Sequence, residues 1–141
     1  MAFHFDHVNL TVVSIERASD FLSIPFPQFR VRGGGEGQYE DMRTAWIHFG
    51  SDQEYVSLNE TSAVEVNARK GSRVSGINHV GFTVVDLARL HGLYEAAGFR
   101  CQWIDESPSR LRLYVTDLDN AMWEFLQYLA DDPAVQNDYS I

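Results

Sequence analysis

The sequence predicts an α+β protein: two tandem βαβββ modules that form a curved, cup-shaped mixed sheet with the helices outside. The first observation is an internal repeat, because residues 5–13 read FDHVNLTVV and residues 77–85 read INHVGFTVV, with five of nine positions identical. The second is that a helix-like pattern follows each copy, and the third is that three strand-like segments follow each helix. One module alone would leave a sheet face open, so the repeat itself predicts the architecture.

Each module opens with a strand whose residues alternate between apolar and polar. The apolar face of the first copy carries Val8, Leu10 and Val12, and that of the second carries Val80, Phe82 and Val84. The opposite faces carry His7, Asn9 and Thr11 in the first copy and His79, Gly81 and Thr83 in the second. We therefore expect the apolar faces to pack on helices and the two histidines to point away from them.

A helix follows each of these strands. Ser14 and Asp86 are N-cap residues, Pro25 ends the first helix, and Gly98 fits the residue just beyond the second. The apolar residues at helical spacing are Ile15, Ala18, Phe21 and Leu22 in the first helix and Leu87, Leu90, Leu93, Tyr94 and Ala97 in the second. Both segments are thus predicted to be amphipathic helices.

Three further strands complete each module. They are expected near residues 29–32, 43–49 and 54–59, and near residues 100–105, 110–116 and 122–128. Residues 50–52 and 117–120 have turn composition, and the glycine-rich residues 33–37 are predicted to be a flexible loop that could act as a lid. The predicted organisation is a first module at 1–60, a linker at 61–76, a second module at 77–129 and a C-terminal tail at 130–141, together forming one domain.

Composition narrows the classes of partner. The formal net charge is −9, which disfavours nucleic acid and anionic membranes as partners, since both require clustered Lys and Arg. No apolar run approaches the length of a membrane span, and the single cysteine, Cys101, excludes an internal disulfide. These features predict a soluble cytoplasmic protein, with Cys101 as a packed thiol.

A metal site is the main chemical prediction. Glu124 lies in the apolar strand AMWEFLQY, where an ionised carboxylate requires a cation or hydrogen-bond donors. If the polar faces of the two modules meet, His7, His79 and Glu124 converge from three strands. Two imidazoles and a carboxylate suit Fe, Mn, Ni, Co or Zn as a divalent ion. The other histidines, His4, His48 and His91, are expected to be ordinary core or surface residues.

The sequence resembles the vicinal oxygen chelate superfamily, which includes glyoxalase I, extradiol dioxygenases and bleomycin-binding proteins. The resemblance is carried by DHVNLTVVSIERASDFL, NHVGFTVVDLARLHGLYEAAGF and RLRLYVTDLDNAMWEFLQY. It implies metal ligands on the first and last strands of each module, which are His7, His79 and Glu124 here. The fourth such position aligns with Ser57, a poor ligand. That pattern looks more like dioxygenases and fosfomycin-resistance transferases than like glyoxalase I.

The resemblance implies a metal-dependent enzyme whose small oxygenated substrate binds the metal through two neighbouring oxygens. A lyase, dioxygenase, isomerase or thiol transferase all remain open, and the catalytic acid or base is not assigned. The residues expected to contact substrate are Asn9, Thr11, Ser57, Thr83, Tyr114 and Arg112. The alternative is a non-catalytic protein that binds bleomycin-type drugs. A homodimer is expected, because a paired sheet has edges to cover.

Overall fold

A computed structural model describes residues 4–62, 76–107 and 109–139. The chain divides into two compact units, Met1–Asn67 and Ala68–Ile141, and each has its own sheet and helix. The elements of the first unit are β1 (Asn9–Val12), α1 (Ile15–Ser23), β2 (Arg30–Tyr39), β3 (Met42–Gly50) and β4 (Tyr55–Thr61). Those of the second are β5 (His79–Thr83), α2 (Leu87–Ala96), β6 (Arg100–Ser107), β7 (Arg110–Thr116), β8 (Met122–Tyr128) and α3 (Pro133–Gln136).

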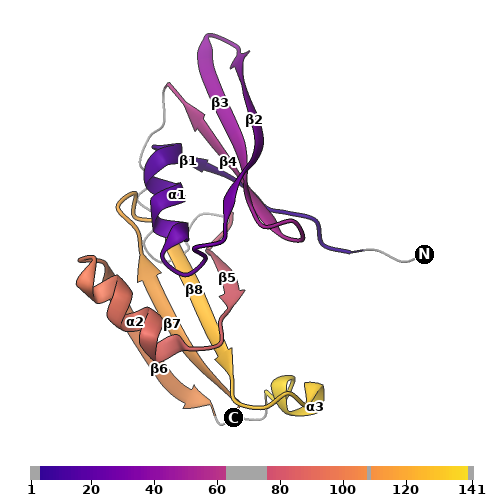
Figure 1. Cartoon of the computed structure of the whole chain (residues 1–141), viewed down its shortest axis with the longest axis vertical. Coiled ribbons are helices and arrows are strands. Elements are labelled where there is room, and N and C mark those ends of the chain that lie inside the picture. Colours follow the sequence, from indigo (N-terminus) through magenta and orange to yellow (C-terminus); the bar gives the residue numbers. More distant parts are fainter. Residues whose placement is uncertain (1–3, 63–75, 108, 140–141) are drawn as a thin grey trace. The chain divides into compact units, whose positions relative to one another are not determined.

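The two sheets have the same topology. Their strand orders are β1-β4-β3-β2 and β5-β8-β7-β6, and in each the first pair is parallel while the other two pairs are antiparallel. Figure 1 shows α1 beside the first sheet and α2 beside the second. The predicted α+β class with two βαβββ modules is confirmed as two four-stranded mixed sheets.

Each unit buries the apolar face of its helix against its own sheet. In the first unit the core side chains include Ala18, Phe21, Leu22, Phe49, Val56 and Leu58. In the second they include Leu87, Leu90, Tyr94, Leu113, Val115, Trp123 and Phe125. The sheet residues come from alternate positions of the strands, so the other face of each sheet is left for polar side chains.

Both helices begin with the same pair of hydrogen bonds. The side chains of Ser14 and Asp86 accept from the third backbone N–H of their helices, as predicted for N-caps. The first N–H of α1 donates to Glu60 Oε2, and the first N–H of α2 donates to Gln127 Oε1, both over 2.8 Å. A side chain near the end of the last strand therefore holds the start of each helix.

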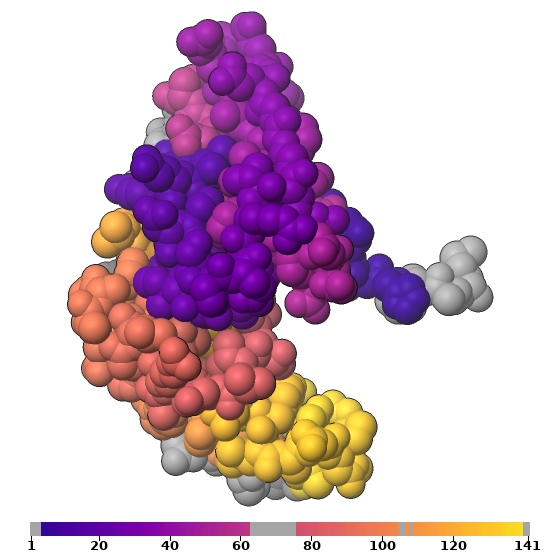
Figure 2. Space-filling view, in the orientation of Figure 1, coloured from indigo at the N-terminus to yellow at the C-terminus, as the bar shows by residue number. Residues whose placement is uncertain are grey.

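The glycine-rich segment departs from its prediction as a flexible loop. Residues 33–37 lie within the ten-residue strand β2, which pairs with β3 as far as Tyr39 and has a register shift between Val31 and Gly33. Every residue of β2 is exposed, and the hairpin that it forms with β3 lies at the surface (Figure 2). A Cβ on Gly34 would lie 2.5 Å from the carbonyl oxygen of Trp46, so the close approach of the two strands requires glycine there.

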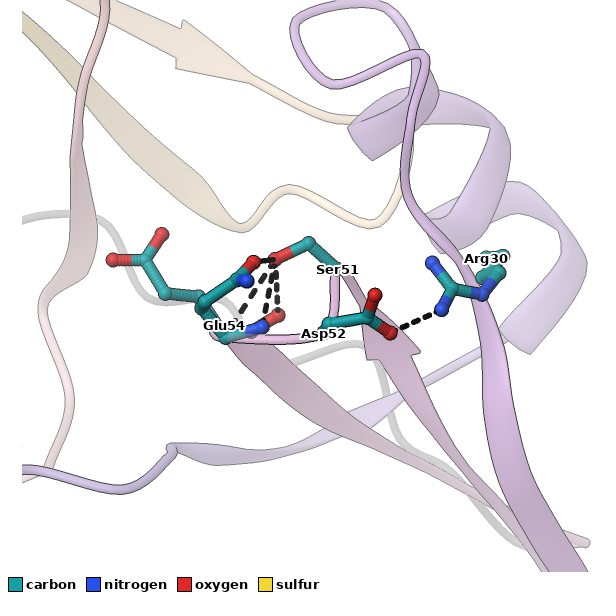
Figure 3. Close-up of polar contacts among 5 residues, drawn as sticks. Arg30, Ser51, Asp52 and Glu54 are labelled. Atoms are coloured by element: carbon teal, nitrogen blue, oxygen red, sulfur yellow. Dashed lines mark hydrogen bonds and ion pairs between the residues drawn. The ribbon is translucent and has the colours of Figure 1, made fainter.

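The predicted turns are present in both units. The turn between β3 and β4 is closed by Ser51, whose backbone N–H donates to the Glu54 carbonyl over 2.8 Å. Its hydroxyl accepts from the Glu54 N–H, and the neighbouring Asp52 forms an ion pair with Arg30 of β2 (Figure 3). The corresponding turn of the second unit is organised by Asp117.

Asp117 is largely buried and accepts three hydrogen bonds. Its Oδ1 accepts from the backbone N–H groups of Asp119 and Ala121, both over 2.9 Å, and its Oδ2 accepts from Trp123 Nε1 over 2.8 Å. Burial raises the pKa of Asp117, while these donors oppose that shift. Asn120 completes the turn in the left-handed region, with φ of 65°.

The end of the chain contains a short helix, α3, within the segment predicted to be a surface tail. Most of the predicted linker lies outside the described residues. Within the part of the chain that the structure describes, no helix is both long enough and apolar enough to cross a membrane.

Candidate metal centre

The polar face of the second sheet brings His79 and Glu124 together. The parallel pairing of β5 with β8 places Gly81 opposite Glu124, and the antiparallel pairing of β7 with β8 places Tyr114 on its other side. Gly81 has no side chain to cover the carboxylate, and a Cβ there would lie 3.6 Å from Glu124 Oε2. The register thus places Gly81 and Tyr114 on either side of Glu124, and His79, the first residue of β5, contacts its Oε2.

The two oxygens of Glu124 have different partners. Oε2 lies 3.0 Å from His79 Nε2, and Oε1 accepts a hydrogen bond from the Tyr114 hydroxyl over 2.6 Å. The residue is only 9% exposed, so these contacts provide the polar partners that a buried carboxylate requires. The prediction that Glu124 needs polar partners in its apolar strand agrees with this geometry.

Tyr114 is a hydrogen-bond donor over the physiological pH range. Burial raises the pKa of its hydroxyl, and the hydrogen bond to Glu124 and the charge of that carboxylate raise the pKa further, against a smaller opposing effect of Arg112. The sequence suggested Tyr114 as a substrate contact. That role stays a prediction, and in the structure the Tyr114 hydroxyl donates to Glu124, a contact that depends on cross-strand register.

Arg112 lies two residues before Tyr114 on the same face of β7. Its Nε is buried and has no hydrogen-bond partner among the described residues. A buried guanidinium N–H without a partner is costly, and an anionic oxygen would remove that cost. Arg112 therefore brings a positive charge to this face of β7 together with one buried donor that is unsatisfied.

His79 is oriented from its other side by its neighbour in the chain. The Nδ1 of His79 lies 2.9 Å from Asn78 Oδ1, and the Tyr114 ring meets the imidazole edge to face at a centroid distance of 5.6 Å. The contact with Asn78 leaves Nε2 facing Glu124. An Nδ1–H held by an oxygen acceptor is the usual arrangement of a metal-binding histidine.

His7 occupies the matching position in the first unit, and a similar contact holds it. Its Nδ1 lies 2.6 Å from Asp6 Oδ2, which also accepts a hydrogen bond from the Tyr55 hydroxyl over 2.7 Å. The hydrogen bond from Tyr55, followed by that from His7, lowers the pKa of Asp6. The Asp6 carboxylate is therefore ionised at neutral pH and acts only as an acceptor.

Aromatic and imidazole rings lie next to one another beside His7 in the first unit. The Tyr55 ring stacks on His7 at 4.9 Å, His48 lies 4.6 Å from Tyr55, and Trp46 lies 5.0 Å from His48, all between centroids. Arg32 lies over the Tyr55 ring at 4.4 Å. His48 was expected to be an ordinary residue. The alternation of β3 could have shown that it shares a face with Trp46, but its proximity to His7 depends on the pairing of β3 with β4.

Ser57 is the counterpart of Glu124 in the first unit. It pairs with Asn9 of β1 and with His48 of β3, as Glu124 pairs with Gly81 and Tyr114. It is 2% exposed. The absence of a carboxylate at this position, noted from the sequence, thus coincides with a buried hydroxyl that faces an imidazole across the strand pair.

The predicted substrate contacts fall on both units. Asn9 and Thr11 are exposed on β1, Ser57 is buried on β4, Thr83 is exposed on β5, and Arg112 and Tyr114 are half-buried on β7. His4 is exposed, and His91 pairs with Glu95 on α2 at 3.3 Å. The structure therefore joins Arg112 and Tyr114 to the His79–Glu124 pair and places the remaining contacts on other strands.

The His79–Glu124 separation suits either a direct hydrogen bond or two ligands of one divalent ion. Two ligands that bind one ion at about 2.1 Å and at a right angle lie about 3.0 Å apart. The separation of Nε2 and Oε2 is 3.0 Å. Within the described ranges no group of three or more His, Cys, Asp or Glu residues forms a complete site. His7 belongs to the other unit, so its membership of the ligand set remains a prediction.

Solved structures show which fold this is. A glyoxylase/bleomycin resistance protein/dioxygenase domain from Frankia sp. EAN1pec superposes with a TM-score of 0.76 at 20% identity, over 94% of this chain and 96% of that chain. A glyoxalase family protein from Bacillus cereus gives 0.71 at 13% identity, over 92% and 97%. The chain has the fold of the vicinal oxygen chelate superfamily.

Proteins with this vicinal oxygen chelate fold include one solved with a metal. The fosfomycin resistance protein FosX from Listeria monocytogenes, complexed with Mn(II) and a sulfate ion, gives a TM-score of 0.67 at 16% identity, over 98% of this chain and 100% of that one. No family model matches the sequence, and no curated protein matches it. The structural likeness therefore establishes the fold, and function is argued from the site.

Proposed function

We propose that this chain is a divalent-metal-dependent enzyme of the vicinal oxygen chelate superfamily that acts on a small, oxygen-rich substrate. The observation that carries the proposal is the His79–Glu124 pair, with 3.0 Å between Nε2 and Oε2 and the Tyr114 hydroxyl on the second carboxylate oxygen. The third ligand is His7, which occupies in the first module the place of His79 in the second. The Mn(II) in the FosX structure supports a metal of this class.

A bound divalent ion supplies Lewis-acid polarisation of a coordinated substrate oxygen. The chain's own residues prepare the site for that chemistry. Tyr114 holds Glu124 by Oε1 and leaves Oε2 for the metal, while Asn78 holds His79 with Nε2 facing the same point. Arg112, a half-buried cation two residues from Tyr114 on the same face of β7, favours a substrate with an acidic oxygen.

The second unit contains two histidine–glutamate pairs, one at the proposed site and one on the surface of α2, which allows a matched test. Glu124→Gln removes the carboxylate at the proposed site, whereas Glu95→Gln removes the partner of His91 on the surface of α2. We expect Glu124→Gln to lower the affinity for Mn(II) by about a hundredfold or more and Glu95→Gln to leave it unchanged. Equilibrium titration with Mn(II) after anaerobic reconstitution measures both. Equal affinities in the two variants would show that Glu124 is not a ligand.

The substrate class requires a separate measurement. The metal-loaded protein is incubated with fosfomycin in the presence of water or thiols, with hemithioacetals and with catechols, and turnover is followed by product analysis. Bleomycin binding to the metal-free protein is measured in parallel. Metal-dependent turnover of any of these compounds supports the enzyme. Stoichiometric bleomycin binding without metal affinity would establish the non-catalytic alternative instead.

A further inference from the structure

The C-terminal segment, residues 130–139, follows β8 and contains α3 (Figure 1). Its Tyr139 contacts Arg110 at the start of β7, with 4.4 Å between the guanidinium carbon and the ring centroid. Hydrogen bonding to Tyr139 raises the pKa of Arg110 against a smaller opposing effect of burial, and Tyr128, the cross-strand partner of Arg110, adds a further small increase. The Arg110 cation is therefore engaged by a side chain from the end of the chain.

The C-terminal segment is held in shape by its own hydrogen bonds. Asp132 caps α3 by accepting from the Ala134 N–H over 2.8 Å, and the Gln136 side chain donates to the Ala130 carbonyl over 2.9 Å. None of the residues 130–139, all of which the structure describes, is buried, and Tyr139 is 69% exposed. Segments that bury no side chain separate from a domain at little cost. The contact with Arg110 can therefore break while the sheet stays intact.

Arg110 belongs to the face of the second sheet that carries Glu124. The pairing of β7 with β8 is regular along the whole of β7, so alternate residues of β7 share a face. Arg110 and Arg112 therefore lie on the same face as Tyr114, which is opposite Glu124. Both arginines are half-buried. This face thus carries two cations two residues apart, and Tyr139 engages one of them.

We propose that the C-terminal segment is a latch in which Tyr139 occupies Arg110 and withholds it from anionic ligands. With Tyr139 in place, Arg112 serves an oxyanion on this face, and with Tyr139 displaced both guanidinium groups serve it. An oxyanion with two negative charges gains most from the second cation.

The latch lowers the apparent affinity of such a ligand, because the ligand must compete with the Tyr139–Arg110 contact. The reduction equals the free energy of that contact. The inference goes beyond the proposed function, since it concerns the access of anions to β7 and requires no metal.

The test compares the loss of two exposed tyrosines. Tyr139→Leu removes the ring from Arg110, whereas Tyr39→Leu removes a tyrosine of similar exposure, 64% against 69%, from β2 of the first unit. Metal-free protein is titrated with inorganic phosphate at mildly alkaline pH, where phosphate carries two charges, and the backbone ¹⁵N–¹H signals of β7 are followed. We expect Tyr139→Leu to bind phosphate about two- to fivefold more tightly than the parent, the effect of one exposed cation–π contact, and Tyr39→Leu to bind it as the parent does.

A double variant shows whether the gain in affinity passes through Arg110. In the Arg110→Gln background, Tyr139→Leu should leave the phosphate affinity unchanged, since the cation that Tyr139 occupies is gone. Parent-like affinity in Tyr139→Leu, a gain that persists without Arg110, or failure of all these proteins to bind phosphate would each overturn the latch. A parent protein that binds no divalent ion would instead overturn the proposed function, and the phosphate titration would still decide whether the latch exists.

Discussion

The carboxylate of Glu124 shows how a charged group is accommodated in an apolar strand. Its neighbours in β8, Trp123 and Phe125, are buried on the helix side, whereas Glu124 faces the other side of the sheet. Tyr114 satisfies one oxygen, and His79 lies at hydrogen-bond distance from the other. The two oxygens therefore have different partners, Tyr114 on Oε1 and His79 on Oε2.

The hydrogen bond from Tyr114 to Glu124 predicts the effect of removing the Tyr114 hydroxyl. Tyr114→Phe leaves Oε1 of Glu124 without its donor, so the carboxylate is free to rotate and we expect Mn(II) affinity to fall by about tenfold. Titration monitored by the electron paramagnetic resonance of free Mn(II) measures the change. Tyr39→Phe, on the exposed strand β2, is the matched control. Parent-like affinity in Tyr114→Phe would show that this hydrogen bond does not support metal binding.

At the scale of elements, one hydrogen bond in each module links the first residue of the helix to a side chain on the last strand of the sheet. The first N–H groups of α1 and α2 donate to Glu60 and Gln127, which lie three residues beyond Ser57 and Glu124 on β4 and β8. Both contacts are partly buried, so each N–H relies on this side-chain acceptor more than an exposed N–H would. The same strand therefore carries a site position and a helix anchor.

Loss of this anchor should destabilise the second unit. Gln127→Ala leaves the Leu87 N–H without its acceptor at a position where Leu87 is fully buried, and we expect a loss of about 1–2 kcal/mol in the free energy of unfolding. Urea denaturation followed by circular dichroism measures it. Gln102→Ala, on an exposed position of β6, should change stability by less than about 0.5 kcal/mol. Equal losses in both variants would contradict the anchor role.

The elements also show what the sequence could and could not predict. The helices were predictable because capping residues, apolar spacing and a stop signal agreed at Ser14, Pro25 and Asp86. Most strands were predictable from alternation. The extension of β2 through residues 33–37 was not, because glycine carries no side chain to show a pattern and the strand is held by its pairing with β3.

At the scale of the whole molecule, sequence reasoning singled out two residues that the structure brings into contact, His79 and Glu124. His79 was found because it matches His7, and Glu124 because a lone carboxylate stood in an apolar strand. The supporting contacts of Tyr114 and Asn78 were not predicted, since they depend on cross-strand register and on where the regular strand begins. The closeness of His48 to His7 was missed for the same reason.

His48 is the neighbour against which the predicted ligand role of His7 is tested. The ring centroids of His7 and His48 are 5.9 Å apart within the first unit. The repeat favours His7, and we expect His7→Ala to lower Mn(II) affinity by at least about tenfold while His48→Ala lowers it by less than about threefold. Isothermal titration calorimetry on both variants distinguishes them. The reverse order would transfer the ligand role to His48.

The helix anchors have a consequence for how the two halves could diverge. The helix N–H groups donate to Glu60 and Gln127, so Ser57 and Glu124 take no part in attaching the helices. A single substitution at either place can gain or lose a coordinating group while the helix stays attached. A repeated module built in this way can carry a serine at this position in one copy and a glutamate in the other with the same helix attachment in both.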